Sequence, residues 1–232
     1  KERLPAWQLE PVVHEINELL ASIPEVKRFS VAGSFRRVNE TSKDIDFIVA
    51  TEQHDIVREA LLANLVLVET VAAGDTKVSV ILDKEDPVSV DFRLVKNHEF
   101  STALHHFTGS KDHNVRMRQL AKDQGKKISE YGVVQENGTI ETFDSEEAFF
   151  AHFGLPFIPP TVRENGKELE RLAELKDLVT LEDIVSDLHM HTTWSDGAHS
   201  VKEMGEALIA RGYTHGVITD HSHYLKVANG LT

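Results

Sequence analysis

Hydrophobic residues recur along the first hundred positions at two different spacings. After Pro11 they return every three or four residues, which predicts an amphipathic helix. Its apolar members are Val12, Val13, Ile16, Leu19, Leu20 and Ile23. A second helix is predicted over residues 56–65. Short runs of period two, bounded by turn-forming residues, predict strands over residues 28–32, 44–50, 76–82 and 88–95.

The strand pattern also predicts which side chains share a face. In the strand over residues 44–50, Ile45, Phe47 and Val49 point one way, and Asp44 and Asp46 point the other way. In the strand over residues 88–95, Asp91 shares its face with Ser89 and Arg93. The pattern therefore predicts a mixed sheet with one apolar, helix-backed face and one acidic face.

Beyond Lys96 the pattern changes to helices. One helix is predicted to end at Gly109 and another to cover residues 112–124, and short strands are predicted near residues 131–134 and 139–143. The proline-rich residues 155–160 are expected to close this unit.

The rest of the chain has a different character. Residues 164–178 alternate in charge, which predicts a solvated linker helix. From about Leu181 histidines become frequent, and residues 201–219 are expected to supply one helix and the strand after it.

Composition narrows the class of protein. With 232 residues, 41% of them hydrophobic, the chain can bury a sizeable core in one large or two small domains. It has no cysteine, which excludes disulfides and cysteine-ligated zinc and fits a reducing compartment. Its apolar runs are too short and too often interrupted by charge for a signal peptide or a membrane span. We therefore expect a cytoplasmic protein with no membrane partner.

Charge is distributed unevenly. A net charge of −13 argues against a protein that coats nucleic acid uniformly. Residues 111–127 nevertheless form a basic island within this acidic chain, and local charge is what matters for binding nucleic acid. The island contains Lys111, Arg116, Arg118, Lys122, Lys126 and Lys127.

The strongest chemical signal combines a Gly-Ser turn with carboxylates on neighbouring strands. Gly33 and Ser34 precede Arg36 and Arg37, and the three carboxylates that follow are Asp44, Asp46 and Asp91. Two-metal phosphoryl transfer needs bridging carboxylates, and oxygen ligands favour Mg²⁺ or Mn²⁺. Glycine lets the backbone approach a phosphate, serine donates to it and arginine neutralises it. An isolated Asp-x-Asp is usually a solvent-facing strand pair, but the combination indicates a nucleotidyltransferase.

These motifs carry a family resemblance that runs from the first residues to about Phe153. The segments that match are Arg3-Leu4-Pro5, Ala32 to Arg37, Lys43 to Asp46, Gly74 to Lys77, Asp91 to Arg93, His106 to Ser110, His113-Asn114 and Glu130-Tyr131. Together they resemble the palm and thumb of family X DNA polymerases, the DNA polymerase beta group. The resemblance implies an α+β fold, with a nucleotidyltransferase palm over residues 1–95, a small α/β thumb over residues 96–160 and a linker over residues 161–180.

The resemblance also implies residue roles. Asp44, Asp46 and Asp91 would be the metal ligands, with Asp91 also placed to help activate the primer 3′ hydroxyl. The nucleotide would contact Arg3, Gly33, Ser34 and Arg37 through its triphosphate, Phe107 and Gly109 through its sugar, and Asn114 through its base. DNA would contact Lys111, Arg116 and Arg118. This chain departs from the family pattern at His106, where tyrosine is frequent, and at Lys43, where glycine is frequent. A solvated basic helix after a helix-ending Gly109 is the alternative interpretation of the thumb segment.

A second resemblance lies near the end of the chain. The motifs Asp187 to His191, Ser195-Asp196-Gly197 and Thr219 to Ser222 resemble the opening of a PHP domain, a metal-dependent phosphoesterase. On a strand His189 and His191 share one side, and Asp196 and His221 could complete part of a Zn²⁺ or Mn²⁺ cluster. The alternative is that the His-x-His pair is incidental. We expect residues 181–232 to be an N-terminal PHP fragment, incomplete and therefore inactive.

The function expected is DNA-directed DNA synthesis, in which deoxynucleoside triphosphates extend a primer 3′ end on gapped or primer-template DNA during short-gap repair. The PHP part of the family resembles a 3′-to-5′ exonuclease or DNA-end phosphoesterase. Two alternatives stay open: a nucleotidyltransferase acting on a non-DNA acceptor, and a DNA-end-binding scaffold with weak catalysis. The sequence leaves the oligomeric state open.

Overall fold

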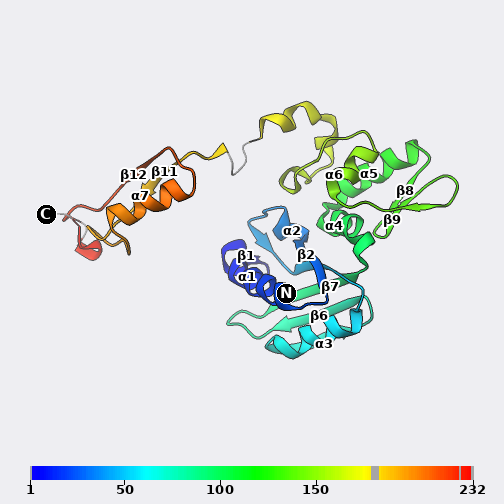
Figure 1. Cartoon of the computed structure of the whole chain (residues 1–232), viewed down its shortest axis with the longest axis horizontal. Helices are drawn as coiled ribbons and strands as arrows, with labels where there is room; N and C mark the ends of the chain where they lie inside the picture. Colours follow the sequence, from blue (N-terminus) through cyan, green and yellow to red (C-terminus); the bar gives the residue numbers. More distant parts are fainter. Residues whose placement is uncertain (1, 179–182, 225, 231–232) are drawn as a thin grey trace. The chain divides into compact units, whose positions relative to one another are not determined.

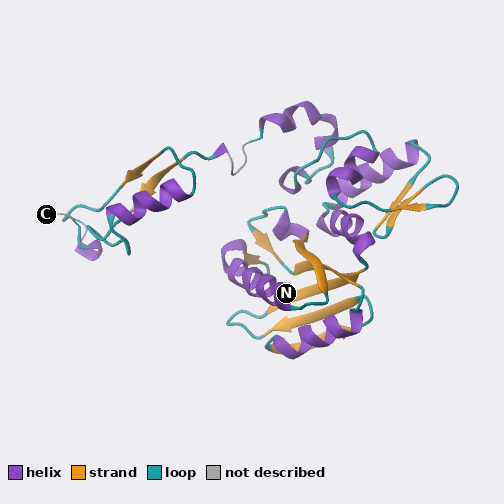
Figure 2. Ribbon diagram, in the orientation of Figure 1, coloured by secondary structure: helices purple, strands orange, loops and turns teal. Residues whose placement is uncertain are grey.

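The computed structural model describes residues 2–178, 183–224 and 226–230. They form two compact units, one extending to Ala173 and the other beginning at Glu174 (Figures 1 and 2). The positions of the two units relative to each other are not determined, so each is described by itself.

A five-stranded sheet forms the centre of the first unit. Its order is β2-β4-β7-β6-β5, and β4 and β7 are parallel while the other neighbours are antiparallel. This confirms the predicted mixed sheet within an α+β fold. The strands are β2 (Val26–Ala32), β4 (Ile45–Thr51), β5 (Leu67–Ala73), β6 (Lys77–Leu82) and β7 (Val88–Val95). A separate short pair consists of β1 (Leu4–Pro5) and β3 (Thr41–Ser42).

One face of this sheet is covered by α1 (Ala6–Ser22) and α3 (His54–Asn64), whose apolar stripes pack on Phe47 and Phe92. Helix α1 begins earlier than predicted and contains Pro11. Leu9 is 1% exposed and extends the buried stripe toward the N-terminus. Its burial favours the longer helix although proline removes one backbone hydrogen bond.

The opposite face is only partly acidic, which corrects the sequence prediction. Ile48 and Ala50 of β4 are fully buried beneath Phe100 and Leu104 of α4 (Phe100–Thr108). Carboxylates occupy only the end of this face where β4 begins. The strand pattern could not show this, because the covering helix lies some fifty residues further along the chain.

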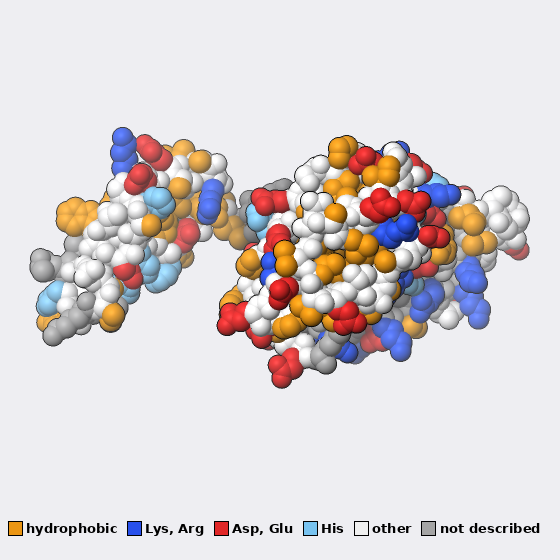
Figure 3. Space-filling model, turned by 90° about the horizontal axis from the view of Figure 1, so that it is seen from below, with side chains coloured by type: hydrophobic (Ala, Val, Ile, Leu, Met, Phe, Trp, Pro, Cys, Tyr) orange, Lys and Arg blue, Asp and Glu red, His pale blue; other side chains and the backbone are white. Residues whose placement is uncertain are grey.

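After α4 the first unit continues with a helical region and a small sheet. Its elements are α5 (Lys111–Asp123), β8 (Lys127–Ser129), β9 (Gly132–Val134), β10 (Ile140–Glu141) and α6 (Glu146–His152). Earlier in the chain, the one-turn helix α2 (Gly33–Arg36) lies between β2 and β3. The small sheet has the order β10-β9-β8 and is antiparallel. On the face drawn in Figure 3, hydrophobic side chains lie among acidic and basic ones.

The predicted linker helix over residues 164–178 is wrong. The structure has 3-10 helices η2 (Pro160–Val162), η3 (Lys167–Glu170) and η4 (Leu172–Asp177). Glu168 is 6% exposed and accepts a hydrogen bond from His113 of α5 at 2.5 Å. Glu168 and Glu170 of this segment therefore pair with His113 and Arg116 of α5 instead of with basic residues of their own segment. The expected division into palm, thumb and linker stays a prediction.

The second unit contains a parallel pair of strands joined through a helix. Strand β11 (Ser186–Met190) pairs with β12 (His215–Ile218), and α7 (Val201–Ala210) lies between them in sequence. Ser200 caps α7 in a reciprocal capping box with Glu203. These are the helix and strand predicted within residues 201–219. A one-turn 3-10 helix, η6 (Lys226–Ala228), comes last. Among the described helices, none has the length and apolar run needed to cross a bilayer.

A buried ionic cluster joins α2 to the region after α4. Arg36 donates to Glu146 at 2.6 and 3.1 Å, and Arg163 donates to the same carboxylate at 2.8 Å. Arg163 is fully buried and Glu146 is 5% exposed. Two nearby arginines lower the pKa of Glu146, although its burial alone would raise it. One carboxylate thus accepts hydrogen bonds from two guanidinium groups and offsets part of their positive charge, whose desolvation would otherwise be costly.

We expect Glu146→Gln to lower the free energy of unfolding by about 3–5 kcal/mol, because it leaves buried Arg163 without a counterion. Urea denaturation followed by circular dichroism measures this. The matched control is Glu170→Gln, which breaks the exposed pair of Glu170 with Arg116 and should cost less than about 1 kcal/mol. Equal denaturation midpoints for the two variants would contradict the buried-cluster argument.

Candidate functional site

The register of β4 against β7 places two of the predicted metal ligands side by side. Asp46 pairs with Asp91 in the parallel ladder, and both lie on the sheet face opposite α1 and α3. Asp44 lies two positions before Asp46, immediately ahead of β4. The structure therefore brings the three carboxylates to one end of one face, as the strand pattern predicts.

Negative charge at this end is only partly balanced. Burial, followed by the charges of Asp91 and Asp44, raises the pKa of Asp46 to about 6. Lys77 of β6 lies with its Nζ 3.2 Å from Oδ2 of Asp91. A cation placed between these carboxylates would offset their mutual repulsion. An all-oxygen donor set of this kind fits Mg²⁺ or Mn²⁺.

Gly33 is fitted to the carboxylate of Asp46. Its φ is +65°, and a Cβ built there would lie 2.5 Å from Oδ2 of Asp46. A side chain at Gly33 would therefore be strained and would also displace the carboxylate. Because residue 33 is glycine, the Gly-Ser turn can lie in direct contact with the Asp-x-Asp motif.

Strand β3 connects two of the predicted triphosphate residues. Ser34 and Ser42 share a hydrogen bond of 2.7 Å between their hydroxyls. Arg3 donates to the Oγ1 and carbonyl oxygen of Thr41 at 2.9 and 2.6 Å. Adjacent residues of β3 thus hold Ser34 and Arg3, and the guanidinium of Arg3 lies on an exposed part of the surface.

The paired arginines both reach beyond the sheet region. Besides Glu146, Arg36 donates to Oγ1 of Thr108 at 2.9 Å. Arg37 donates to the carbonyl oxygen of Thr108 at 2.7 Å and to Glu164 at 2.9 Å, and its side chain is 13% exposed. In this structure Arg37 joins the end of α4 to Glu164. To bind a phosphate, Arg37 would have to give up its ion pair with Glu164.

The predicted sugar and base contacts gather where α4 ends and α5 begins. Asn114 donates to the carbonyl oxygen of His106 at 2.8 Å, and the Arg93 guanidinium lies 4.5 Å above the ring of Phe107. Gly109 ends α4 with φ +67°, and its position beside Nη1 of Arg37 links this turn to the Gly-Ser motif. Gly109 therefore lies beside Arg37, while Asn114 is held against His106 and Phe107 against Arg93.

The predicted DNA-binding residues of α5 differ in their surroundings. Lys111 and Arg118 are exposed. Arg116 is exposed as well, but it forms an ion pair of 2.9 Å with Glu170. The acidic segment after residue 160 thus covers part of the basic island.

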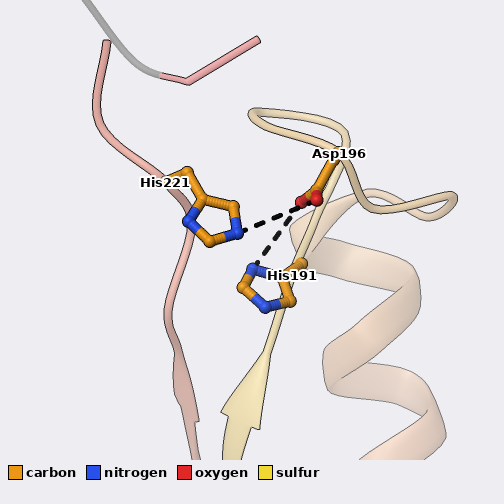
Figure 4. Close-up of side chains that lie close together, drawn as sticks. All are labelled: His191, Asp196 and His221. Atoms are coloured by element: carbon orange, nitrogen blue, oxygen red, sulfur yellow. Dashed lines mark ion pairs between the residues drawn. The ribbon is translucent and has the colours of Figure 1, made fainter. Parts of the chain in front are cut away.

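In the second unit three of the four predicted ligands converge. His191, Asp196 and His221 offer ligand atoms that all lie within 4.8 Å of one another, the only such group found among the described residues (Figure 4). Nδ1 of His191 and Nε2 of His221 lie 3.8 and 3.7 Å from the Asp196 carboxylate. His189 lies beside them, with its Nε2 3.2 Å from Nε2 of His191, but is outside the group. Imidazole and carboxylate donors fit Zn²⁺ or Mn²⁺.

Comparison with known proteins agrees with these motifs. Residues 103–164 match the family model described as DNA polymerase beta thumb. Over all 232 residues the chain is 55% identical to a Bacillus subtilis (strain 168) protein named DNA polymerase/3'-5' exonuclease PolX. The chain belongs to the family X DNA polymerases. It spans 41% of the length of that Bacillus relative.

The fold of this family X chain also resembles a solved structure. The crystal structure of Leishmania infantum polymerase beta, described as a ternary P/T complex, matches with a TM-score of 0.61 at 23% identity. The match covers 71% of this chain and 77% of the Leishmania chain. At this identity the likeness concerns the fold.

The site prediction missed three residues that contact the predicted site residues or the loop that carries one of them. Lys77 contacts Asp91, Glu164 contacts Arg37, and Asp220 accepts hydrogen bonds from the loop that carries Asp196. The sequence contains a signal for two of them, since Lys77 and Asp220 lie within the motifs quoted for the resemblance. No local pattern identifies Glu164, because its partner lies more than a hundred residues away.

We expect Gly33→Ala to weaken Mn²⁺ binding at the carboxylates, because the new methyl group displaces Asp46. Isothermal titration with Mn²⁺ measures this in the His191→Ala background, which removes the second cluster. The control is Gly138→Ala, where φ is +83° and nothing lies within 4 Å of the added Cβ. Both variants should lose about 1 kcal/mol of stability from backbone strain. Equal Mn²⁺ affinities for the two would show that the Gly33 contact does not matter.

Proposed function

We propose that the first unit is the polymerising part of a family X DNA polymerase, which adds deoxynucleotides to a primer 3′ end by a two-metal mechanism. The observation that carries the proposal is the pairing of Asp46 with Asp91 in the β4–β7 ladder, with Gly33 against Asp46. The name of the Bacillus relative supports DNA polymerisation as the reaction.

Asp44, Asp46 and Asp91 would hold the divalent ions, Mg²⁺ or Mn²⁺. Bound there, such ions would lower the pKa of the attacking hydroxyl and would stabilise charge on the leaving pyrophosphate. Burial, and then the charges of Asp91 and Asp44, raise the pKa of Asp46 to about 6, and a bound cation would oppose the contribution of the two charges. Asp91 lies at the exposed end of its strand face, with a side chain 30% exposed, which leaves it accessible to a primer hydroxyl.

Substrate binding would use the residues that connect α2, α4 and α5. Arg3, Gly33, Ser34 and Arg37 would bind the triphosphate, and Phe107, Gly109 and Asn114 would contact the sugar and base. Lys111, Arg116 and Arg118 would contact the phosphates of DNA, since exposed cations on one helix favour a polyanion. The proposed partners are deoxynucleoside triphosphates and gapped or primer-template DNA. The proposed setting is short-gap repair in the bacterial cytoplasm.

For the second unit we propose part of a PHP metal centre. His191, Asp196 and His221 would hold one ion, Zn²⁺ or Mn²⁺, and His189 lies close enough to join after a small movement. The 3'-5' exonuclease in the name of the Bacillus relative supports a phosphoesterase role for the intact domain. The parallel β11–β12 pair is consistent with the beginning of an α/β barrel.

The test of polymerisation is primer extension on a gapped duplex with Mg²⁺ or Mn²⁺. We expect Asp91→Asn to reduce nucleotide incorporation by at least about 10³-fold, because the two-metal site loses a ligand. The control, Asp55→Asn, changes an exposed carboxylate of α3, which covers the other face of the sheet, and should leave the rate unchanged.

The same assay separates the alternatives. Incorporation that ignores the template would favour a nucleotidyltransferase with another acceptor. Salt-sensitive binding to gapped DNA without incorporation would favour a DNA-end-binding scaffold. Replacing deoxynucleotides by ribonucleotides tests the sugar contact at Phe107. Full activity in Asp91→Asn would overturn the proposed site.

A further inference from the structure

We propose that Asp220 is the positioning residue of the His191–Asp196–His221 cluster. The inference rests on the proposed metal centre and adds a residue that holds the ligands without being one. Asp220 follows β12 and lies directly before His221.

The carboxylate of Asp220 accepts three hydrogen bonds from a single loop. Its Oδ1 accepts from the backbone N–H of Thr192 at 2.6 Å and from the hydroxyl of Ser195 at 2.5 Å. Its Oδ2 accepts from the hydroxyl of Thr192 at 2.5 Å. Thr192 is fully buried and Asp220 is half-buried. Hydrogen bonds to a charged acceptor are stronger than those between neutral groups.

Each residue in this set of hydrogen bonds is the chain neighbour of one proposed metal ligand. Thr192 is the chain neighbour of His191, Ser195 is the neighbour of Asp196, and Asp220 is the neighbour of His221. One carboxylate therefore fixes the backbone next to all three ligands at once. Asp220 would hold the loop of β11 against the end of β12, which is where the ligand atoms meet.

The loop that Asp220 holds is closed tightly on itself. The N–H groups of Ser195 and Gly197 donate to the carbonyl oxygen of Thr192 at 3.0 and 2.9 Å. A Cβ at Gly197 would lie 2.4 Å from the carbonyl oxygen of His191. The loop thus returns Asp196 to His191, and Asp220 attaches this closed loop to the strand that carries His221.

Asp220 differs from the ligands in how its oxygens are used. Both accept hydrogen bonds from the loop, and the residue is not a member of the group whose ligand atoms lie within 4.8 Å. The ligands meet one another instead, with the rings of His191 and His221 stacked 4.6 Å apart at an interplanar angle of 15°. Residues that orient ligands in this way typically change metal affinity by about 10- to 100-fold when removed.

The experiment titrates the full chain with Co²⁺ and follows the visible absorption of the bound ion. All variants carry Asp46→Asn and Asp91→Asn, so that the carboxylates of the first unit do not contribute. We expect Asp220→Asn to bind Co²⁺ about 10- to 100-fold more weakly and to change the position or intensity of the absorption bands. A residue that only stabilised the fold would not alter the spectrum at saturation.

Two further variants make the test independent of folding. Ser195→Ala removes one of the three hydrogen bonds and should give a smaller loss of affinity in the same direction. Glu206→Gln changes an exposed side chain of α7 that forms a 3.9 Å ion pair with Lys202, and it should match the reference protein. Circular dichroism of each metal-free variant checks that the second unit stays folded.

The outcomes separate the two hypotheses. If the reference protein and Asp196→Asn bind Co²⁺ equally, the cluster is not a metal site, and the role of Asp220 fails with it. If Asp196→Asn loses binding while Asp220→Asn keeps the reference affinity and spectrum, the metal site stands and the positioning role is overturned. If Asp220→Asn does not fold, an unchanged spectrum and affinity in Ser195→Ala overturns the proposal.

Discussion

The parallel pairing of β4 with β7 is the constraint on which the rest of the first unit depends. Both strands are covered on the face packed by α1 and α3, and α4 covers much of the other face of β4. The rings of Phe47 and Phe92, partners in the ladder, stack at 5.7 Å. A shift of one residue would move every side chain to the opposite face. The core that fixes this register therefore also fixes Asp46 beside Asp91.

Charges buried away from the carboxylates give the unit its second set of constraints. The arginines after the Gly-Ser turn suggest phosphate contacts when the sequence is considered alone. In the structure Arg36 lies in an ionic cluster with Glu146, and Arg37 bridges Thr108 and Glu164. These contacts attach α2, and with it Gly33, to the end of α4. The predicted triphosphate contacts and the predicted sugar contacts are therefore connected through the same two side chains.

Much of this fold could be predicted because its core strands alternate regularly and its longer helices have clear apolar stripes. The prediction missed β5, whose Val68 and Val71 are exposed at the sheet edge, so burial does not shape its pattern. It also missed α6, a helix of only two turns. The error over residues 164–178 has a different cause, since Glu168 and Glu170 pair with α5 and Glu164 pairs with Arg37. The residue types of both clusters were predictable, but the pairing of Asp46 with Asp91 and the loop contacts of Asp220 depend on which strands become neighbours.

The two clusters differ in how far protein contacts alone can assemble them. Carboxylates of like charge repel one another, and the described residues of the first unit hold no group of three whose oxygens all meet within 4.8 Å. Lys77 at Asp91 offsets part of that charge, and a divalent ion binding there must compete with it. The histidine cluster contains a single carboxylate and two imidazoles that can be neutral, so its ligand atoms can approach without a cation. Asp220, whose carboxylate accepts hydrogen bonds from Thr192 and Ser195, can then hold the ligands together. The ligand atoms of the histidine cluster can therefore come together before a metal ion binds. Charge repulsion opposes the same approach among the three carboxylates of the first unit.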